Sequence, residues 1–162
     1  MRKKKHIKVQ DYYPYQLGKI VIPIQLVELE DSSFHLIVRA NINGINGDMI
    51  IDTGASITVA DQTLFINPSN DDCNVNILSG GVNGKIEDVK LVNLKQFYIG
   101  NREIKNIKIA SIDLGYVNEM YEKYLNRKVI GLLGSDFFVR YRASINYDDK
   151  TLSLFIKKHE IR

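Results

Sequence analysis

Apolar and polar residues follow one another along most of the chain in short runs that are separated by clusters of Gly, Asn, Asp and Ser. Runs of this kind are typical of β-strands joined by turns. The pairs Asn43-Gly44 and Asn46-Gly47 both favour hairpin turns. The expected strands cover residues 19–29, 34–42, 48–52, 73–78, 85–94, 94–100, 103–110, 143–147 and 151–156. The pattern therefore predicts a mainly β protein.

Two more hairpins are expected in the second half of the chain, around Gly100-Asn101 and around residues 148–150. Ile107 and Ile109 alternate with polar neighbours, as in a strand that is buried on one face. We therefore expect both isoleucine side chains to point into the core.

One or two short helices interrupt this pattern. Residues 118–128 carry large apolar side chains at intervals of three and four, as an amphipathic helix does. The residues expected to face the core are Met120, Tyr121, Tyr124 and Leu125. A second helix is expected over residues 136–142, with Ser135 as its N-cap.

The chain of 162 residues is 44% hydrophobic, which suits one domain with a full core. Its net charge of +3 comes from the N-terminus, where Arg2, Lys3, Lys4, Lys5 and Lys8 stand close together. Without these five residues, acidic side chains outnumber basic ones. We expect residues 1–18 to be a flexible basic tail, and no nucleic-acid partner.

No export signal or membrane span is expected, because the basic start is followed by polar residues and no apolar run is long enough to cross a bilayer. The lone cysteine, Cys73, has no partner for an internal disulfide. Both observations favour the cytoplasm.

The segment around Asp52 carries the most specific chemical signal. An apolar run leads directly into Asp52-Thr53-Gly54, and small residues, Ala55 and Ser56, come next. An aspartate before Thr-Gly is also a common turn cap. The context favours more than a cap, because a second motif, Leu132-Leu133-Gly134, follows much later in the chain.

In these two motifs, Ile50–Ser56 and Leu132–Phe138, the sequence resembles the retroviral-like (retropepsin-type) aspartic proteases. The resemblance implies a closed acid-protease barrel over residues 19–162, with one or two short helices. It also implies an aspartic endopeptidase that acts on peptide or protein substrates without a cofactor. Asp52 is then the catalytic aspartate, and Leu132, Leu133 and Gly134 form the strand that passes through the active-site loop before a short helix.

Such enzymes use two aspartates, which lie so close together that they hold one shared proton. The chain has only one Asp-Thr-Gly, since neither Asp113 nor Asp136 is followed by Thr-Gly or Ser-Gly. A pair of catalytic aspartates therefore requires a symmetric homodimer. By the same resemblance, Thr53 bonds across the dimer interface and Gly54 presents its N–H to the carboxylate. Ala55 lacks the hydroxyl donor that pepsin-like relatives often carry at this position, so we expect activity at mildly acidic pH.

The substrate is expected to lie against Ala55 and Ser56 on one side and a flap on the other. The flap candidate is the glycine-rich segment from Ser79 to Gly84. Its expected contact residues are Gly80, Gly81, Val82, Asn83 and Gly84. Two features depart from the retroviral pattern: Ser135 stands where Arg is common, and the helix over residues 118–128 is an insertion.

Other functions are less well supported. The three histidines are scattered and no paired-cysteine spacing occurs, which argues against a metal site. Cys73 lies among acidic residues, which disfavours a cysteine hydrolase with His35. Two readings stay open beside the protease: a catalytically silent binding or assembly module with the same fold, and a small β protein in which Asp52 only caps a turn.

Overall fold

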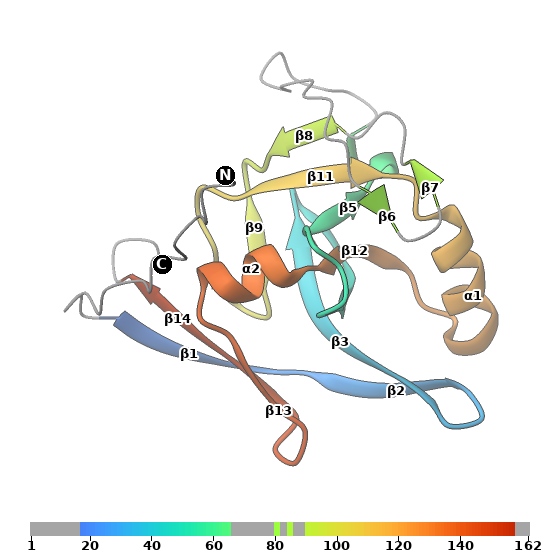
Figure 1. Cartoon of the computed structure of the whole chain (residues 1–162), viewed down its shortest axis with the longest axis horizontal. Coiled ribbons are helices and arrows are strands. Elements are labelled where there is room, and N and C mark those ends of the chain that lie inside the picture. Colours follow the sequence, from blue (N-terminus) through green and yellow to red (C-terminus); the bar gives the residue numbers. More distant parts are fainter. Residues whose placement is uncertain (1–16, 66–79, 82–83, 86–89, 158–162) are drawn as a thin grey trace, which may run out of the picture.

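A computed structural model of the protein describes residues 17–65, 80–81, 84–85 and 90–157. Most of these residues lie in strands, so the mainly β prediction is confirmed (Figure 1). The strands are β1 (Leu17–Pro23), β2 (Gln25–Glu30), β3 (Ser33–Ile42), β4 (Ile45–Ile51), β5 (Val59–Asp61), β6 (Gly80–Gly81), β7 (Gly84–Lys85), β8 (Lys90–Asn93), β9 (Phe97–Ile99), β10 (Arg102–Glu103), β11 (Lys108–Ile112), β12 (Val129–Leu133), β13 (Ser144–Asn146) and β14 (Thr151–Lys157). The helices are α1 (Gly115–Leu125), α2 (Ser135–Arg140) and a 3₁₀ turn, η1 (Gln62–Phe65).

The largest sheet contains the strands that carry both sequence motifs. Its strand order is β10-β9-β3-β4-β12-β5-β11-β8, and β2 pairs with the outer part of β3. The sheet curls into a half-barrel, and β10 and β8 remain as its two ends among the described strands. β12 lies between β4, to which it is parallel, and β5, to which it is antiparallel.

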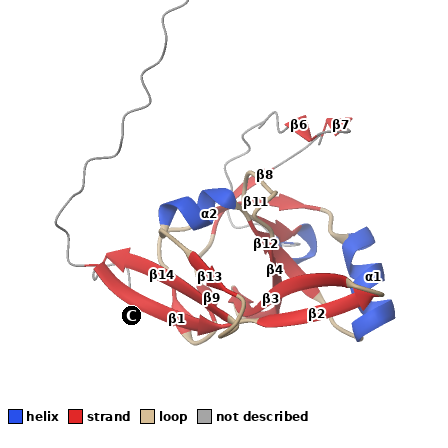
Figure 2. Cartoon of the chain, turned by 60° about the horizontal axis from the view of Figure 1, so that its bottom comes forward, coloured by secondary structure: helices blue, strands red, loops and turns tan. Residues whose placement is uncertain are grey.

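A second sheet, in the order β1-β14-β13, lies at one end of the molecule, and α1 lies at the other end beside the β2–β3 hairpin (Figures 1 and 2). The sequence pattern predicted one strand over residues 19–29, and this was wrong. The chain changes sheets at Pro23 and Ile24, where the Ile24 amide donates to the Lys150 carbonyl. Proline has no N–H for a strand ladder, which explains why the strand ends there.

One of the two Asn-Gly pairs forms the predicted turn. Asn43 and Gly44 both have positive φ angles, 50° and 90°, and join β3 to β4 in a two-residue hairpin. The turn predicted at Asn46-Gly47 was wrong, because both residues lie inside β4. Gly47 is required there for packing, since a Cβ atom would lie 2.3 Å from Cγ2 of Ile130.

The other described hairpins agree with the prediction. β9 and β10 pair around Gly100-Asn101, and β13 and β14 pair around residues 147–150. Ile107 and Ile109 are buried, as their alternation predicted. The strand expected over residues 73–78 lies outside the described residues. Within the strand expected over residues 85–94, the structure describes Lys85, which belongs to β7, and β8.

Both helices form, with different ends from those predicted. α1 starts three residues earlier than residue 118 and ends where Asn126 adopts a left-handed conformation with φ of 50°. Tyr121 is fully buried, but Tyr124 is 39% exposed and bonds to Glu30, so its predicted core position was wrong. α2 has Gly134 as its N-cap, and the predicted cap at Ser135 was wrong, because the Ser135 hydroxyl bonds elsewhere.

Aliphatic side chains from one face of the curled sheet and from β1 and β14 of the second sheet fill the main core, with Phe97, Phe137 and Tyr141 among them. A smaller cluster around Tyr121 attaches α1 to β3 and β4. No helix within the described residues has the length and apolar character that a membrane crossing needs.

Candidate active site

Asp52 is the first residue after β4, and its loop leads to β5. Its amide donates to the Leu133 carbonyl at 3.0 Å, and its side chain is half-buried. Oδ1 accepts hydrogen bonds from the amides of Gly54 at 2.9 Å and Ala55 at 3.2 Å. The Gly54 contact is the one that the resemblance implied for this residue. Two amide donors fix the orientation of the carboxylate.

The second oxygen of the same carboxylate is in a different situation. Oδ2 of Asp52 accepts no hydrogen bond from the part of the chain that the structure describes. An aspartate that only caps a turn also uses one oxygen for backbone amides, so the bonds to Oδ1 alone do not identify its role. Oδ2 of this fixed, half-buried carboxylate is therefore available as an acceptor, as a general base requires.

The segment Leu132-Leu133-Gly134 lies directly beside the Asp52 loop. β12 runs parallel to β4 with Leu133 opposite Ile51, so both strands end at the same level. Gly134 then passes so close to the chain that a Cβ atom would lie 2.5 Å from the Ile57 carbonyl oxygen and 2.9 Å from the Thr58 nitrogen. A side chain cannot be placed there without moving backbone, which explains glycine at the end of this motif.

Three further hydrogen bonds join the same two segments. The Ser135 amide donates to the Ala55 carbonyl at 2.8 Å, and the Ser135 hydroxyl donates to the Thr53 carbonyl at 2.9 Å. The Gly134 amide donates to the buried Thr58 hydroxyl at 3.1 Å. Together with the bond from Asp52 to Leu133, they hold the Asp52 loop against the start of α2.

The remaining predicted site residues lie as follows. Thr53 and Ser56 are exposed, and Ala55 is half-buried. Gly80 and Gly81 pair in antiparallel fashion with Lys85 and Gly84, so the backbone forms the hairpin that the glycine-rich segment predicted. Val82 and Asn83 lie outside the described residues. β6 and β7 pair only with each other among the described strands.

Residues 38–137 match the sequence profile of a family described as "Aspartyl protease". This span is more than half of the chain and contains both Asp52 and Gly134. The chain belongs to the aspartyl protease family. Among solved structures, it is similar to a retropepsin-like aspartic protease from Rickettsia conorii, with a TM-score of 0.46 and 20% identity over 90% of this chain and 97% of that chain. No curated protein sequence matches it.

This member of the family has a buried ionic cluster that the sequence did not suggest. Asp48 in β4 is completely buried and accepts hydrogen bonds from two arginines. Arg127 donates from Nε at 2.6 Å and from Nη2 at 3.0 Å, and Arg39 donates from Nη1 at 2.8 Å. Since Arg127 lies two residues after the end of α1, the cluster anchors this helix to the strand that leads to Asp52. The sequence feature that could have indicated this cluster is the acid Asp48 directly before the apolar residues 49–51.

The same region contains a buried tyrosine with a shifted pKa. Burial raises the pKa of the Tyr121 hydroxyl from 10.0 to about 12, and the negative charge of Asp48 adds to the shift. The hydroxyl therefore stays protonated at neutral pH and lies 2.7 Å from Nδ1 of His35. This contact joins α1 to β3.

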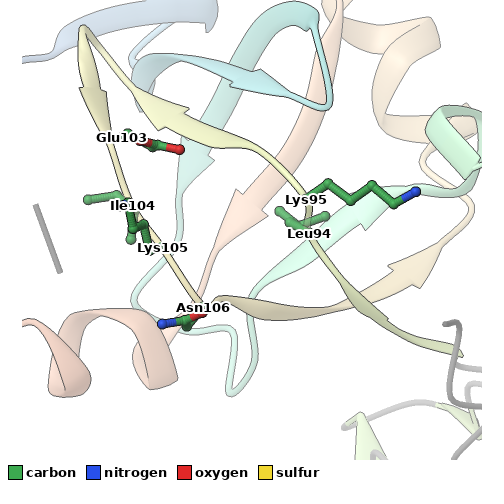
Figure 3. Close-up of a pocket in the computed structure, with 6 residues that line it drawn as sticks. All are labelled: Leu94, Lys95, Glu103, Ile104, Lys105 and Asn106. Atoms are coloured by element: carbon green, nitrogen blue, oxygen red, sulfur yellow. The ribbon is translucent and has the colours of Figure 1, made fainter. Parts of the chain in front are cut away.

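A pocket of about 290 Å³ lies away from the Asp52 loop, between the segment that follows β8 and the one that follows β10 (Figure 3). Its lining residues are Leu94, Lys95, Glu103, Ile104, Lys105 and Asn106. None of them belongs to the two motifs. Within the described residues, no three His, Cys, Asp or Glu side chains are grouped so that they could hold a metal ion.

Proposed function

We propose that this protein is a retropepsin-like aspartic endopeptidase that hydrolyses peptide bonds with a water molecule held between Asp52 and its counterpart in a second copy of the chain. The observation that carries the proposal is the Asp52-Thr53-Gly54 loop, which hydrogen bonds hold against the end of β12 and the start of α2. Oδ1 is fixed by the Gly54 and Ala55 amides, while Oδ2 has no partner among the described residues. The family membership supports the same reading.

The need for a second copy follows from the acids that the chain offers. Asp136 lies near the loop, but its Oδ1 accepts from the Thr58 hydroxyl and the Phe137 amide. Asp113 uses its Oδ1 to accept from the Gly115 amide before α1. Asp52 also uses its Oδ1 in a local turn, but of these three acids only Asp52 is followed by Thr-Gly, which leaves it as the candidate acid. A twofold axis beside the loop would bring two copies of Asp52 together.

In the proposed reaction, the two carboxyl groups hold one proton between them, because two negative charges at hydrogen-bond distance repel strongly. The ionised member takes a proton from water, and the protonated member donates its proton to the carbonyl oxygen of the peptide bond. Hydroxide adds to the carbonyl carbon, and breakdown of the tetrahedral intermediate releases an amine and a carboxylic acid.

Two other features support this arrangement. Thr53 is exposed, and its hydroxyl makes no hydrogen bond to the described residues, so it is available for a bond to a second subunit. The β6–β7 hairpin is short and rich in glycine, as a flap that closes over a peptide would be. We propose that this hairpin excludes water from the cleft, with Ala55 and Ser56 on the opposite wall.

The direct test is digestion of a diverse peptide mixture between pH 4 and pH 7, with mass spectrometry of the products. The native protein is expected to cleave peptides, and pepstatin is expected to inhibit it. Asp52→Asn should be at least roughly 10³-fold slower, since both proton transfers depend on the pair. Equal cleavage by both proteins would reject the proposal. Peptide binding without cleavage would instead identify a silent binding module.

A further inference from the structure

The peptide unit between Thr53 and Gly54 is held from both sides by side chains of different segments. On one side, its carbonyl oxygen accepts a 2.9 Å hydrogen bond from the Ser135 hydroxyl. On the other side, its N–H, which belongs to Gly54, donates a 2.9 Å hydrogen bond to Oδ1 of Asp52. Because the peptide unit is planar and rigid, the direction of the carbonyl fixes the direction of the N–H.

This peptide is one that can rotate. It lies at the centre of the turn after β4, and Gly54 has no Cβ atom to restrict it. A rotation by half a turn would place the carbonyl oxygen, in place of the N–H, against the Asp52 carboxylate. That arrangement is electrostatically unfavourable for an ionised acid and removes one of its two amide donors.

Ser135 is placed to prevent the rotation. Its own amide is bound to the Ala55 carbonyl at 2.8 Å, which fixes the residue at the start of α2. Its hydroxyl does not cap the helix. Within the described part of the chain, no other donor bonds to the Thr53 carbonyl.

We infer that Ser135 is a positioning residue, whose hydroxyl orients the Thr53-Gly54 peptide so that the Gly54 amide donates to Asp52. The consequence for catalysis rests on the proposed function. The orientation of the peptide does not depend on the proposed function, because it can be measured on a protein without activity.

The test follows the backbone amide of Gly54 by ¹⁵N NMR as the pH is lowered. In the native protein, its resonance should shift as the Asp52 carboxylate takes up a proton, and in Asp52→Asn this shift should be absent. In Ser135→Ala, the shift should fall to less than about half of its native size and the amide should exchange with solvent roughly 10-fold faster, because a lost hydrogen bond of this strength changes an equilibrium by about that factor.

Three further variants complete the test. Ser135→Thr keeps the hydroxyl and should behave as the native protein does, whereas Ser135→Val has the same shape as the threonine variant without the hydroxyl and should behave as Ser135→Ala does. Ser144→Ala removes an exposed serine on β13 and should change nothing. If Ser135→Ala does not fold, the comparison of Thr with Val decides. An unchanged Gly54 titration in the variants without the hydroxyl would overturn the inference.

Activity provides the second measurement. If the protein cleaves peptides, Ser135→Ala should lower kcat roughly 10-fold with little change in KM, and the acidic side of its pH profile should move to higher pH. A protein that never cleaves but shows the expected Gly54 behaviour would reject the proposed function and keep the inference. Peptide cleavage together with native Gly54 behaviour in the variants would support the proposed function and overturn the inference.

Discussion

The Thr58 hydroxyl donates a 2.8 Å hydrogen bond to Oδ1 of Asp136, and it accepts one from the Gly134 amide at 3.1 Å. Thr58 is 1% exposed, and its bond from the buried Gly134 amide forms where water cannot replace it. The Thr58 side chain is therefore a hydrogen-bond partner of both the Gly134 amide and the Asp136 carboxylate in the first turn of α2. The two sequence motifs are joined by their side chains as well as by pairing of β4 with β12.

Replacement of Thr58 by valine should show the energy of this connection. The variant keeps the shape of the side chain but leaves the buried Gly134 amide without an acceptor, which costs about 1–3 kcal/mol. Urea unfolding should show this loss, and peptidase activity should fall as the loop loosens. Thr58→Ser keeps the hydroxyl and should retain most of the stability. Equal stability of the valine variant and the native protein would contradict the account.

Gly134→Ala should be destabilising for a steric reason. Its new methyl group would lie 2.5 Å from the Ile57 carbonyl oxygen, and neither backbone segment is free to move. We expect a loss of about 1–3 kcal/mol in thermal or urea unfolding. Gly115→Ala is the matched control, because the nearest atom to its methyl group would be the carboxylate oxygen of the exposed Asp113 side chain. A Gly134→Ala variant as stable as this control would argue against the close approach.

The ionic cluster at Asp48 should depend mainly on Arg127. The Arg127 side chain is 25% exposed and makes two bonds to Asp48, whereas Arg39 is 61% exposed and makes one. Arg127→Gln leaves a fully buried carboxylate poorly compensated and should cost about 3 kcal/mol. Arg39→Gln removes a largely exposed arginine, while Arg127 still pairs with Asp48, and should cost less than about 1 kcal/mol. Chemical denaturation of both variants checks the order, which the opposite ranking would contradict.

Tyr121 should make stability fall in strongly alkaline solution. Below pH 10, the folded and unfolded chains both keep its proton. Between pH 10 and about pH 12 the unfolded chain loses the proton while the folded chain keeps it, so stability falls as the pH rises through this window. The loss should reach up to about 3 kcal/mol and should be absent in Tyr121→Phe.

Unfolding by urea at several pH values measures this difference. Tyr147→Phe changes an exposed tyrosine and should keep the native pH dependence. Ultraviolet absorbance adds a second check, because Tyr121→Phe should remove a tyrosine whose pKa is about 12. Identical pH dependence in native protein and Tyr121→Phe would show that Tyr121 is not shifted.

Features that depend on neighbouring residues were predictable from the sequence. The hairpin at Asn43-Gly44 follows from the backbone preferences of two adjacent residues, and α1 follows from the spacing of its apolar side chains. The Asp52 loop and the Leu132-Leu133-Gly134 segment beside it could be located for the same reason, because their motifs are short and continuous.

Features that depend on distant residues were not predictable. Asn46-Gly47 has the composition of a turn, but Gly47 is packed against Ile130 of another strand. Ser135 has the composition of a helix cap, but the close approach of the Asp52 loop offers its hydroxyl the Thr53 carbonyl. In both cases tertiary contacts override a local preference, and only the arrangement of β4, β5 and β12 reveals them.

We expect catalysis to need one Asp52 from each of two subunits, and mixing native with variant subunits tests this expectation. A fixed amount of native protein is incubated with increasing amounts of Asp52→Asn, and the initial rate of peptide cleavage is measured, with the same mass of serum albumin as control. If the claim holds, native chains are drawn into mixed dimers with a single catalytic aspartate, and the rate falls towards zero at a roughly tenfold excess of the variant. If added variant leaves the rate as constant as added albumin does, Asp52 acts within one chain. That result would contradict catalysis by a pair of subunits.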